Sequence, residues 1–190
     1  MKLSKRGEYA LRALIDLGIS QELGRPLLQI SELVEKEKLP EKFLVQILVQ
    51  MREAGIIESK RGKHGGYSLA RPMDSINFGY VIRLIDGPLA PIACCSQTAY
   101  APCTCPDEAH CGLRMLMLDV RNAIANVLDR YTLADIVDVT LRKLKRDNAS
   151  FHLGEIFGGV LDVSDAEPVS LPRPVRRVRS KVGMPLRGTP

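Results

Sequence analysis

Residues 56–69 read Ile-Ile-Glu-Ser-Lys-Arg-Gly-Lys-His-Gly-Gly-Tyr-Ser-Leu, two short β-prone runs that flank a basic, glycine-rich segment. Branched and aromatic residues favour strands, and short connections that contain glycine favour hairpins. The sequence therefore predicts a β-hairpin with strands at 56–59 and 67–69 and a basic tip between them.

Three helices are predicted upstream of this hairpin. Ser4 is placed to cap the first, whose apolar residues recur at three- and four-residue spacing. Ser31 is placed to cap a second, short helix over 32–37. Pro40 occupies the first position of a third helix, which is expected to stop at Gly55.

A fourth helix is predicted downstream of the hairpin, capped by Asn77 and ended by Gly87 and Pro88. Three helices, a hairpin and a further helix in this order predict a winged helix-turn-helix over residues 1–88. The expected fold class is mainly α with a small β-hairpin wing.

Composition and charge narrow the function classes. The 190-residue chain is 45% hydrophobic and 26% charged, and it lacks the roughly 18 consecutive apolar residues of a membrane-spanning helix. No apolar signal segment follows the charged N-terminus, so we expect a cytoplasmic protein with no membrane partner. Residues 1–73 carry 13 Lys/Arg and 9 Asp/Glu (net +4), residues 74–163 carry 8 and 11 (net −3), and residues 164–190 carry 6 and 2 (net +4). A polyanionic partner is therefore expected to bind the two basic segments, residues 1–73 and 164–190.

A long helix with an apolar seam is predicted after residue 112, because its apolar positions alternate in steps typical of paired helices. Thr132 and Asp135 fit a capping-box start for one more helix, so residues 113–163 are predicted to form a dimerisation helix and a C-terminal helix. Residues 164–190 are proline-rich and basic, with too little apolar content to fold, and are predicted to be a disordered tail. The seam consists of Leu113, Met117, Val120, Ile124, Val127 and Tyr131.

Basic and amide side chains on the third helix and at the hairpin tip are candidate DNA contacts. Lysine and glutamine can hydrogen-bond base edges in the major groove, and cations near the first helix can hold phosphates without reading sequence. Winged helices also serve as protein-interaction modules, and a polar helix face is often only solvated, so the residues alone leave both interpretations open. The candidates are Lys5 and Arg6, then Lys42 and Gln46 with Gln50 on the same face, and finally Arg61, Gly62 and Lys63.

Five cysteines lie within 18 residues, with the spacing Cys94-Cys95-x7-Cys103-x-Cys105-x5-Cys111. Thiols at this density suit zinc or an iron–sulfur cluster, whereas the lack of a Cys-x2-Cys pair weakens a zinc-ribbon interpretation. The prolines and glycine around them predict a loop over 89–112. The candidate ligands are Cys94, Cys103, Cys105 and Cys111, with Cys95 spare; a metal-free thiol switch remains open.

Three motifs resemble the Rrf2 family of bacterial transcription regulators. They are Lys-Leu-Ser-Lys-x2-Glu-Tyr-Ala-Leu-Arg-Ala-Leu at 2–14, Arg-Gly-x3-Gly-Tyr-x-Leu-Ala at 61–70 and Leu-x-Asp-Gly-Pro at 84–88. The resemblance covers about residues 1–141. It implies a homodimer on double-stranded DNA in which the long helix pairs across the two-fold axis. It also implies a cluster, 2Fe–2S or 4Fe–4S, in the loop before that helix.

The cysteine spacing departs from that of cluster-binding family members, which use three cysteines about six residues apart. The step from Cys105 to Cys111 is six, whereas that from Cys94 to Cys105 is 11. Arg114 stands where one branch of the family has a histidine ligand. Glu8 stands where other branches have an acidic ligand from the partner subunit; from the residues alone it is a first-turn carboxylate favoured by the helix dipole.

The sequence thus predicts a cytoplasmic, homodimeric winged-helix transcription regulator, a repressor whose iron–sulfur cluster senses redox state, nitric oxide or iron–sulfur supply. The alternative is a zinc-binding or thiol-switch winged-helix module for protein interaction, without a cluster. An enzyme is not expected, because the sequence has no phosphate loop, nucleophile motif or histidine–carboxylate constellation.

Overall fold

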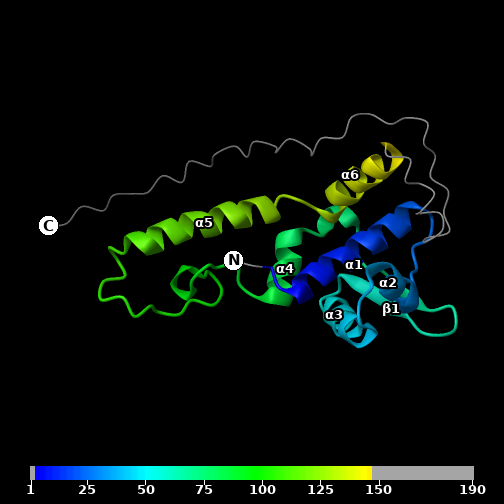
Figure 1. The fold of residues 1–190 in the computed structure, drawn as a ribbon, viewed down its shortest axis with the longest axis horizontal. Helices are drawn as coiled ribbons and strands as arrows, with labels where there is room; N and C mark the ends of the chain where they lie inside the picture. The colour runs from blue at the N-terminus through cyan, green and yellow to red at the C-terminus, as the bar shows by residue number, and fades with distance from the viewer. Residues whose placement is uncertain (1–2, 147–190) are drawn as a thin grey trace.

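The computed structural model describes residues 3–146, which are mainly helical with one small hairpin (Figure 1). The predicted disordered tail and residues 147–163 lie outside the described residues. In chain order, the elements are α1 (Lys5–Glu22), α2 (Ile30–Glu37), α3 (Glu41–Glu53), β1 (Ile57–Lys60), β2 (Gly66–Leu69), the 3-10 turn η1 (Met73–Ser75), α4 (Phe78–Asp86), the 3-10 turn η2 (Ala93–Cys95), α5 (Gly112–Leu128) and α6 (Leu133–Arg146). The predicted fold class is confirmed.

The hairpin is anchored to the chain before α2. β1 and β2 are antiparallel, with Ile57 opposite Leu69. Tyr67 exchanges two backbone hydrogen bonds with Leu28, at 3.0 and 2.8 Å. A Cβ atom on Gly66 would lie 2.3 Å from the Leu28 carbonyl oxygen, so only glycine allows this approach. The wing is therefore held at its base and extends from there.

α1 lies at the centre of the hydrophobic core (Figure 1), and α3, α4, α6 and β2 pack around it. Ala10 and Ala13 are fully buried, and their small side chains let the neighbouring helices approach closely. The buried side of α3 is equally apolar, which leaves the opposite side of that helix facing solvent. The buried residues of α3 are Leu44, Ile47, Leu48 and Met51.

Two predicted helix caps are confirmed and two helix starts are corrected. The side chain of Ser4 accepts a hydrogen bond from the Gly7 amide, and that of Asn77 accepts one from the Tyr80 amide. α2 begins earlier than predicted: Gln29, not Ser31, is its N-cap, because a capping box forms between Gln29 and Glu32. Pro40 is the N-cap of α3, with extended backbone, and not its first helical residue.

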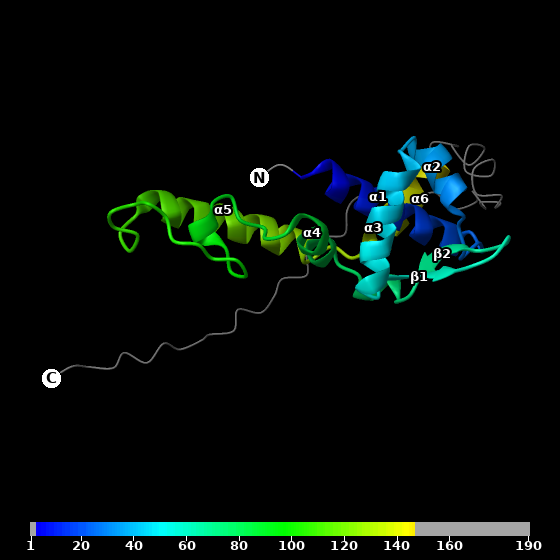
Figure 2. The same ribbon diagram turned by 90° about the horizontal axis from the view of Figure 1, so that it is seen from below.

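α5 leaves the core and extends away from it (Figures 1 and 2), and α6 returns to pack against α1. The return is fixed by backbone hydrogen bonds. The Phe78 amide donates to the Tyr131 carbonyl at 3.2 Å, and the Leu133 amide donates to the Ile76 carbonyl at 2.7 Å. Tyr131 therefore lies beyond the end of α5 and packs against the core, which corrects its predicted place in the seam.

Three predicted seam residues, Leu113, Val120 and Val127, are exposed on α5. Met117 and Ile124 are half-buried within the chain, and Leu116 is exposed in place of Met117. The exposed residues follow one another in steps of three, four and seven, so they lie on one side of the helix. The stripe consists of Leu113, Leu116, Val120 and Val127, with exposed fractions of 57, 56, 36 and 46%. In the part of the chain that the structure describes, no helix is long and apolar enough to cross a membrane.

Candidate functional site

The exposed side of α3 carries the predicted base-reading residues. Lys42 and Gln46 are both exposed and lie four residues apart, so they are one turn apart on the same side of the helix. Glu41 is also exposed, at the N-terminal end. A helix with a buried apolar side and a free polar side can enter a major groove without disturbing the core.

Gln50 lies on this helix but faces the interior, which corrects its predicted exposure. Its side-chain oxygen accepts a hydrogen bond from Arg6 at 2.9 Å, and its side-chain nitrogen donates to the Leu84 carbonyl at 2.7 Å. Arg6 is half-buried, so this contact fixes part of its guanidinium group. Gln50 therefore joins α1, α3 and α4.

The hairpin tip presents Arg61, Gly62 and Lys63 to solvent, as the sequence predicts. Gly62 has a φ of 118°, in a region that favours glycine. A Cβ atom on Gly65 would lie 2.1 Å from the Lys60 carbonyl, so the turn closes tightly. The basic side chains are thus carried on a compact turn with a defined backbone.

Glu8 takes part in ion pairs within its own helix. Its carboxylate lies 2.8 Å from Lys5 Nζ and 3.6 Å from Arg12 Nη1. The hydrogen bond from Lys5 holds the pKa of Glu8 below its ordinary value and raises the pKa of Lys5. Glu8 is consequently an ionised, partly exposed carboxylate. Lys5, which is predicted to hold a DNA phosphate, forms an ion pair with it.

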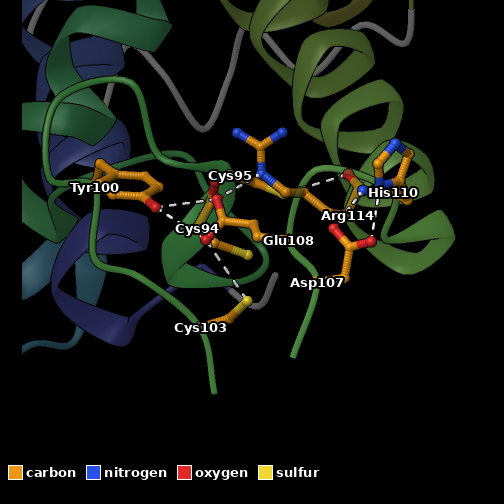
Figure 3. A network of polar contacts seen from close by, with 8 residues as sticks. All are labelled: Cys94, Cys95, Tyr100, Cys103, Asp107, Glu108, His110 and Arg114. Atoms are coloured by element: carbon orange, nitrogen blue, oxygen red, sulfur yellow. Dashed lines mark hydrogen bonds and ion pairs between the residues drawn. The ribbon is translucent and has the colours of Figure 1, made fainter. Parts of the chain in front are cut away.

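The five cysteines lie between α4 and the start of α5, as free thiols, and Figure 3 shows three of them, Cys94, Cys95 and Cys103. Cys94 is buried on η2, whereas Cys105 is exposed. The hydrogen bond with Cys103, and the repulsion that two neighbouring thiolates would feel, raise the pKa of Cys105 to about 11, and Cys111 contributes in the same direction. Burial raises the pKa of Cys94, and Cys95 and Cys103 add to this effect. Cys103 and Cys111 therefore both lie near enough to Cys105 to affect its thiol, and Cys103 also affects Cys94.

Glu108, which was not predicted as a site residue, contacts three other residues of the cysteine loop and α5 through its side chain. Its carboxylate accepts hydrogen bonds from the Tyr100 hydroxyl at 2.9 and 3.0 Å and from the Cys103 thiol at 3.7 Å. It also forms an ion pair with Arg114 at 3.1 Å, and Arg114 donates to the Cys94 carbonyl at 3.2 Å (Figure 3). The signal in the sequence is a pair of acidic residues, Asp107 and Glu108, between Cys105 and Cys111. Arg114, which cannot be a ligand, instead ties the loop to the first turn of α5.

Other polar side chains of the loop contact neighbouring residues of the loop or of α5. The Cys95 thiol contacts the Arg114 carbonyl at 3.5 Å, away from the exposed thiols. His110 is exposed, and its Nδ1 lies 2.7 Å from Asp107. Within the described residues, no three His, Cys, Asp or Glu side chains are placed to hold a single metal ion.

Comparison with known proteins identifies the family. The family model described as "Rrf2: Iron-dependent Transcriptional regulator" matches residues 3–139. The chain belongs to the Rrf2 family. Its relatives are transcription regulators and not enzymes, so the chain is a helix-turn-helix transcription regulator that acts on DNA.

Three relatives show how much of the Rrf2 fold is shared. An rrf2-like helix-turn-helix regulator of Rhodobacter capsulatus is 36% identical over 137 residues, 71% of this chain and 91% of that protein. The solved structure of CymR, the global cysteine regulator of Bacillus subtilis, is 30% identical, with a TM-score of 0.59 over 73% of this chain and 97% of that chain. That of IscR from T. potens is 28% identical, with a TM-score of 0.56 over 73% and 87%.

Proposed function

We propose that this Rrf2 regulator is a homodimer that carries an iron–sulfur cluster in the loop between α4 and α5, and that the cluster changes its affinity for DNA. The observation that carries the proposal is the position of three free cysteines, Cys103, Cys105 and Cys111, in one short loop directly before α5. A cofactor held in this loop would lie between the winged helix and α5, the helix with the exposed apolar stripe.

The donor set fits a cluster better than a single zinc ion. Structural zinc sites commonly pair their cysteines as Cys-x2–4-Cys, a spacing that this loop lacks. Iron–sulfur clusters are held by cysteine thiolates in more varied spacings. Cys103, Cys105 and Cys111 would hold it, with Cys94 or Glu8 of the partner subunit as the remaining ligand.

When bound, the cluster would supply a centre that responds to oxidants, nitric oxide or iron supply. The chain's own residues do the rest. Arg114 joins Glu108 to the Cys94 carbonyl and thereby holds the loop on α5. The Tyr100 hydroxyl donates to the same carboxylate and closes the loop from its other side. Rearrangement of the thiols therefore acts directly on the start of α5.

DNA recognition follows from the exposed polar side of α3 and the basic wing. Lys42 and Gln46 would read bases in the major groove, while Arg61 and Lys63 would contact the backbone or the minor groove. A dimer presents two such units, so the operator should be roughly palindromic with half-sites about one helical turn apart. Repression follows where such a site overlaps a promoter.

Anaerobic purification with iron, sulfide and zinc analysis tests the cofactor. We expect iron and sulfide, visible absorption near about 400 nm, and DNA affinity that differs between holo and apo protein. Cys105→Ser should lose the absorption. Cys95→Ser is the matched control, because the Cys95 thiol faces the Arg114 carbonyl, and it should keep the absorption. Zinc without iron, or equal affinity of holo and apo protein, would contradict the proposal.

A metal-free thiol switch is the second candidate, favoured by the contact between Cys105 and Cys111 as free thiols. The relatives include CymR of Staphylococcus aureus, whose structure was also solved in an oxidized form. If iron is absent, mass spectrometry after peroxide treatment should find a loop disulfide. DNA binding should then change with oxidation and be restored by a reducing agent.

A further inference from the structure

A cleft lies between α4, the segment that follows η2, and the middle of α5. About 270 Å³ of space lies between its lining residues, open solvent included. We propose that this cleft binds a small oxyanion, such as sulfate, phosphate or a short carboxylate. The site contains no cysteine and is independent of the proposed cluster. Its lining residues are Arg83, Pro88, Leu89, Ala90, Ser96, Gln97, Thr98, Arg121 and Ala125.

Arg121 is the basis of the proposal. It is only 8% exposed although it lies on α5, the helix that extends away from the core. Its Nε has no hydrogen-bond partner, and no carboxylate within the described residues pairs with its guanidinium group. Arginine is almost never buried unless it is paired, because removal of a charge from water is costly without a counter-charge. A largely buried arginine whose Nε has no partner among the described residues, in a cleft without acidic residues, therefore favours a bound anion.

The other charged group of the cleft is already neutralised. Arg83 donates two hydrogen bonds to Asp129, at 2.6 and 2.8 Å, so its charge is already paired with a carboxylate. No lining residue is acidic. The uncompensated charge in the cleft is thus that of Arg121, and it is positive.

Hydroxyl groups on the segment after η2 complete the binding chemistry. The Ser96 oxygen accepts a hydrogen bond from the Ala99 amide at 2.9 Å, so the Ser96 hydroxyl hydrogen is left to donate elsewhere. Thr98 is exposed at the opening and supplies a second hydroxyl donor. Guanidinium and hydroxyl donors together match the acceptor-rich surface of an oxyanion. The cleft is small and open on one side, which favours a small anion over a larger organic ligand.

Isothermal titration of the full-length protein with sodium sulfate, sodium phosphate or sodium acetate tests the site, with sodium chloride at matched ionic strength as the reference. We expect saturable binding of at least one of these anions. Arg121→Gln, which removes the charge and keeps an amide, should weaken it at least about tenfold. Arg130→Gln removes an exposed charge near the end of α5, outside the cleft, and should bind like the wild type.

The fold of each variant is checked by circular dichroism and thermal unfolding. If Arg121→Gln does not fold, Thr98→Val is used in its place to test the site, because Thr98 is exposed and its replacement leaves the core intact. We expect Thr98→Val to bind the anion several-fold more weakly than the wild type. Absence of saturable binding to all three anions would overturn the proposal, as would equal losses in Arg121→Gln and Arg130→Gln, or unchanged binding by Thr98→Val. A loss of self-association in Arg121→Gln without anion binding in the wild type would also overturn it, since the counter-charge would then come from a second copy.

Discussion

Asp86 accepts two hydrogen bonds from Ser4, one from its backbone amide at 2.9 Å and one from its hydroxyl at 2.5 Å. Ser4 caps the start of α1, and Asp86 is the last residue of α4. The two residues come from two separate motifs of the Rrf2 resemblance, 82 positions apart. Gly7 allows this contact, because a Cβ atom there would lie 2.6 Å from the Asp86 carboxylate.

Replacing Asp86 by Ala should lower the free energy of unfolding by about 1–2 kcal/mol, since both hydrogen bonds to the carboxylate and the coupling of α1 to α4 are lost. Urea denaturation measures the change. Asp74→Ala, at an exposed position in η1, is the matched control and should change stability by less than about 0.5 kcal/mol. Equal effects of the two substitutions would show that the contact with Ser4 does not stabilise the fold.

Two glutamines on α3 should respond oppositely to replacement by Ala. Gln46→Ala should keep wild-type stability and relax operator specificity by about 1–3 kcal/mol, because Gln46 is exposed and would read a base. Gln50→Ala should destabilise the protein, because it removes the contacts with Arg6 and Leu84. Operator titrations and thermal unfolding of both variants separate these effects; a specificity change in Gln50→Ala alone would reverse the assignment.

Lys63→Ala should weaken binding to operator and random DNA by the same factor. Lys63 is exposed at the wing tip and would neutralise a phosphate, so its loss should reduce the slope of log affinity against log salt by about one unit per engaged wing. Binding is measured from about 50 to 200 mM salt. Lys38→Ala, in the turn after α2, provides a comparison with a lysine outside the wing. A loss confined to the operator would contradict a backbone contact.

The double variant Leu116→Asp/Val120→Asp should be monomeric at micromolar concentration, because it places two charges on the exposed apolar stripe of α5. The wild type is expected to sediment as a dimer. Asn122→Asp/Asn126→Asp adds the same two charges at exposed polar positions of the same helix and should remain dimeric. If the first variant also sediments as a dimer, the stripe is not the interface.

Asp16 should make stability fall as the pH rises from 5 to 8. Burial raises its pKa to about 7, against the opposing effect of Lys36 at 2.5 Å, and Glu37 from α2 raises it further while pairing with Arg12. A carboxyl with a raised pKa stabilises the fold below its unfolded pKa and loses that contribution as the pH passes its folded pKa.

Denaturation at pH 5 and pH 8 measures this effect. The wild type should lose on the order of 2–3 kcal/mol relative to Asp16→Asn over this interval, since the asparagine cannot ionise. Parallel stability curves for the two proteins would show that Asp16 does not titrate in this range.

The sequence predicted the winged helix well because its signals are local. Glycines 62, 65 and 66 are required by backbone geometry at the wing, and Ser4 and Asn77 cap the helices beside them. Such signals depend on a few neighbouring residues. They are therefore readable before any tertiary contact is known.

The errors arose where a tertiary contact chooses between equivalent faces. On α5, positions 116 and 117 are both apolar, and only the packing of the rest of the chain shows which one is left exposed. Likewise Gln50 lies on the same helix as Gln46, but its side chain faces the interior because it forms hydrogen bonds with Arg6 and the Leu84 carbonyl. A buried Arg121 was not foreseeable, because charged residues on a helix are ordinarily solvated.

The two ends of α5 are attached in different ways. Its C-terminal end continues into the backbone hydrogen bonds between residues 76–78 and 131–133, whereas its N-terminal end begins at Cys111, on the loop. The helix is about 25 Å long, so a displacement of about 2 Å at Cys111 tilts it by about 5°. α5 can therefore tilt about its C-terminal end, which is held beside the N-terminus of α4. A movement at its cysteine end reaches the winged helix as a rotation and not as a translation.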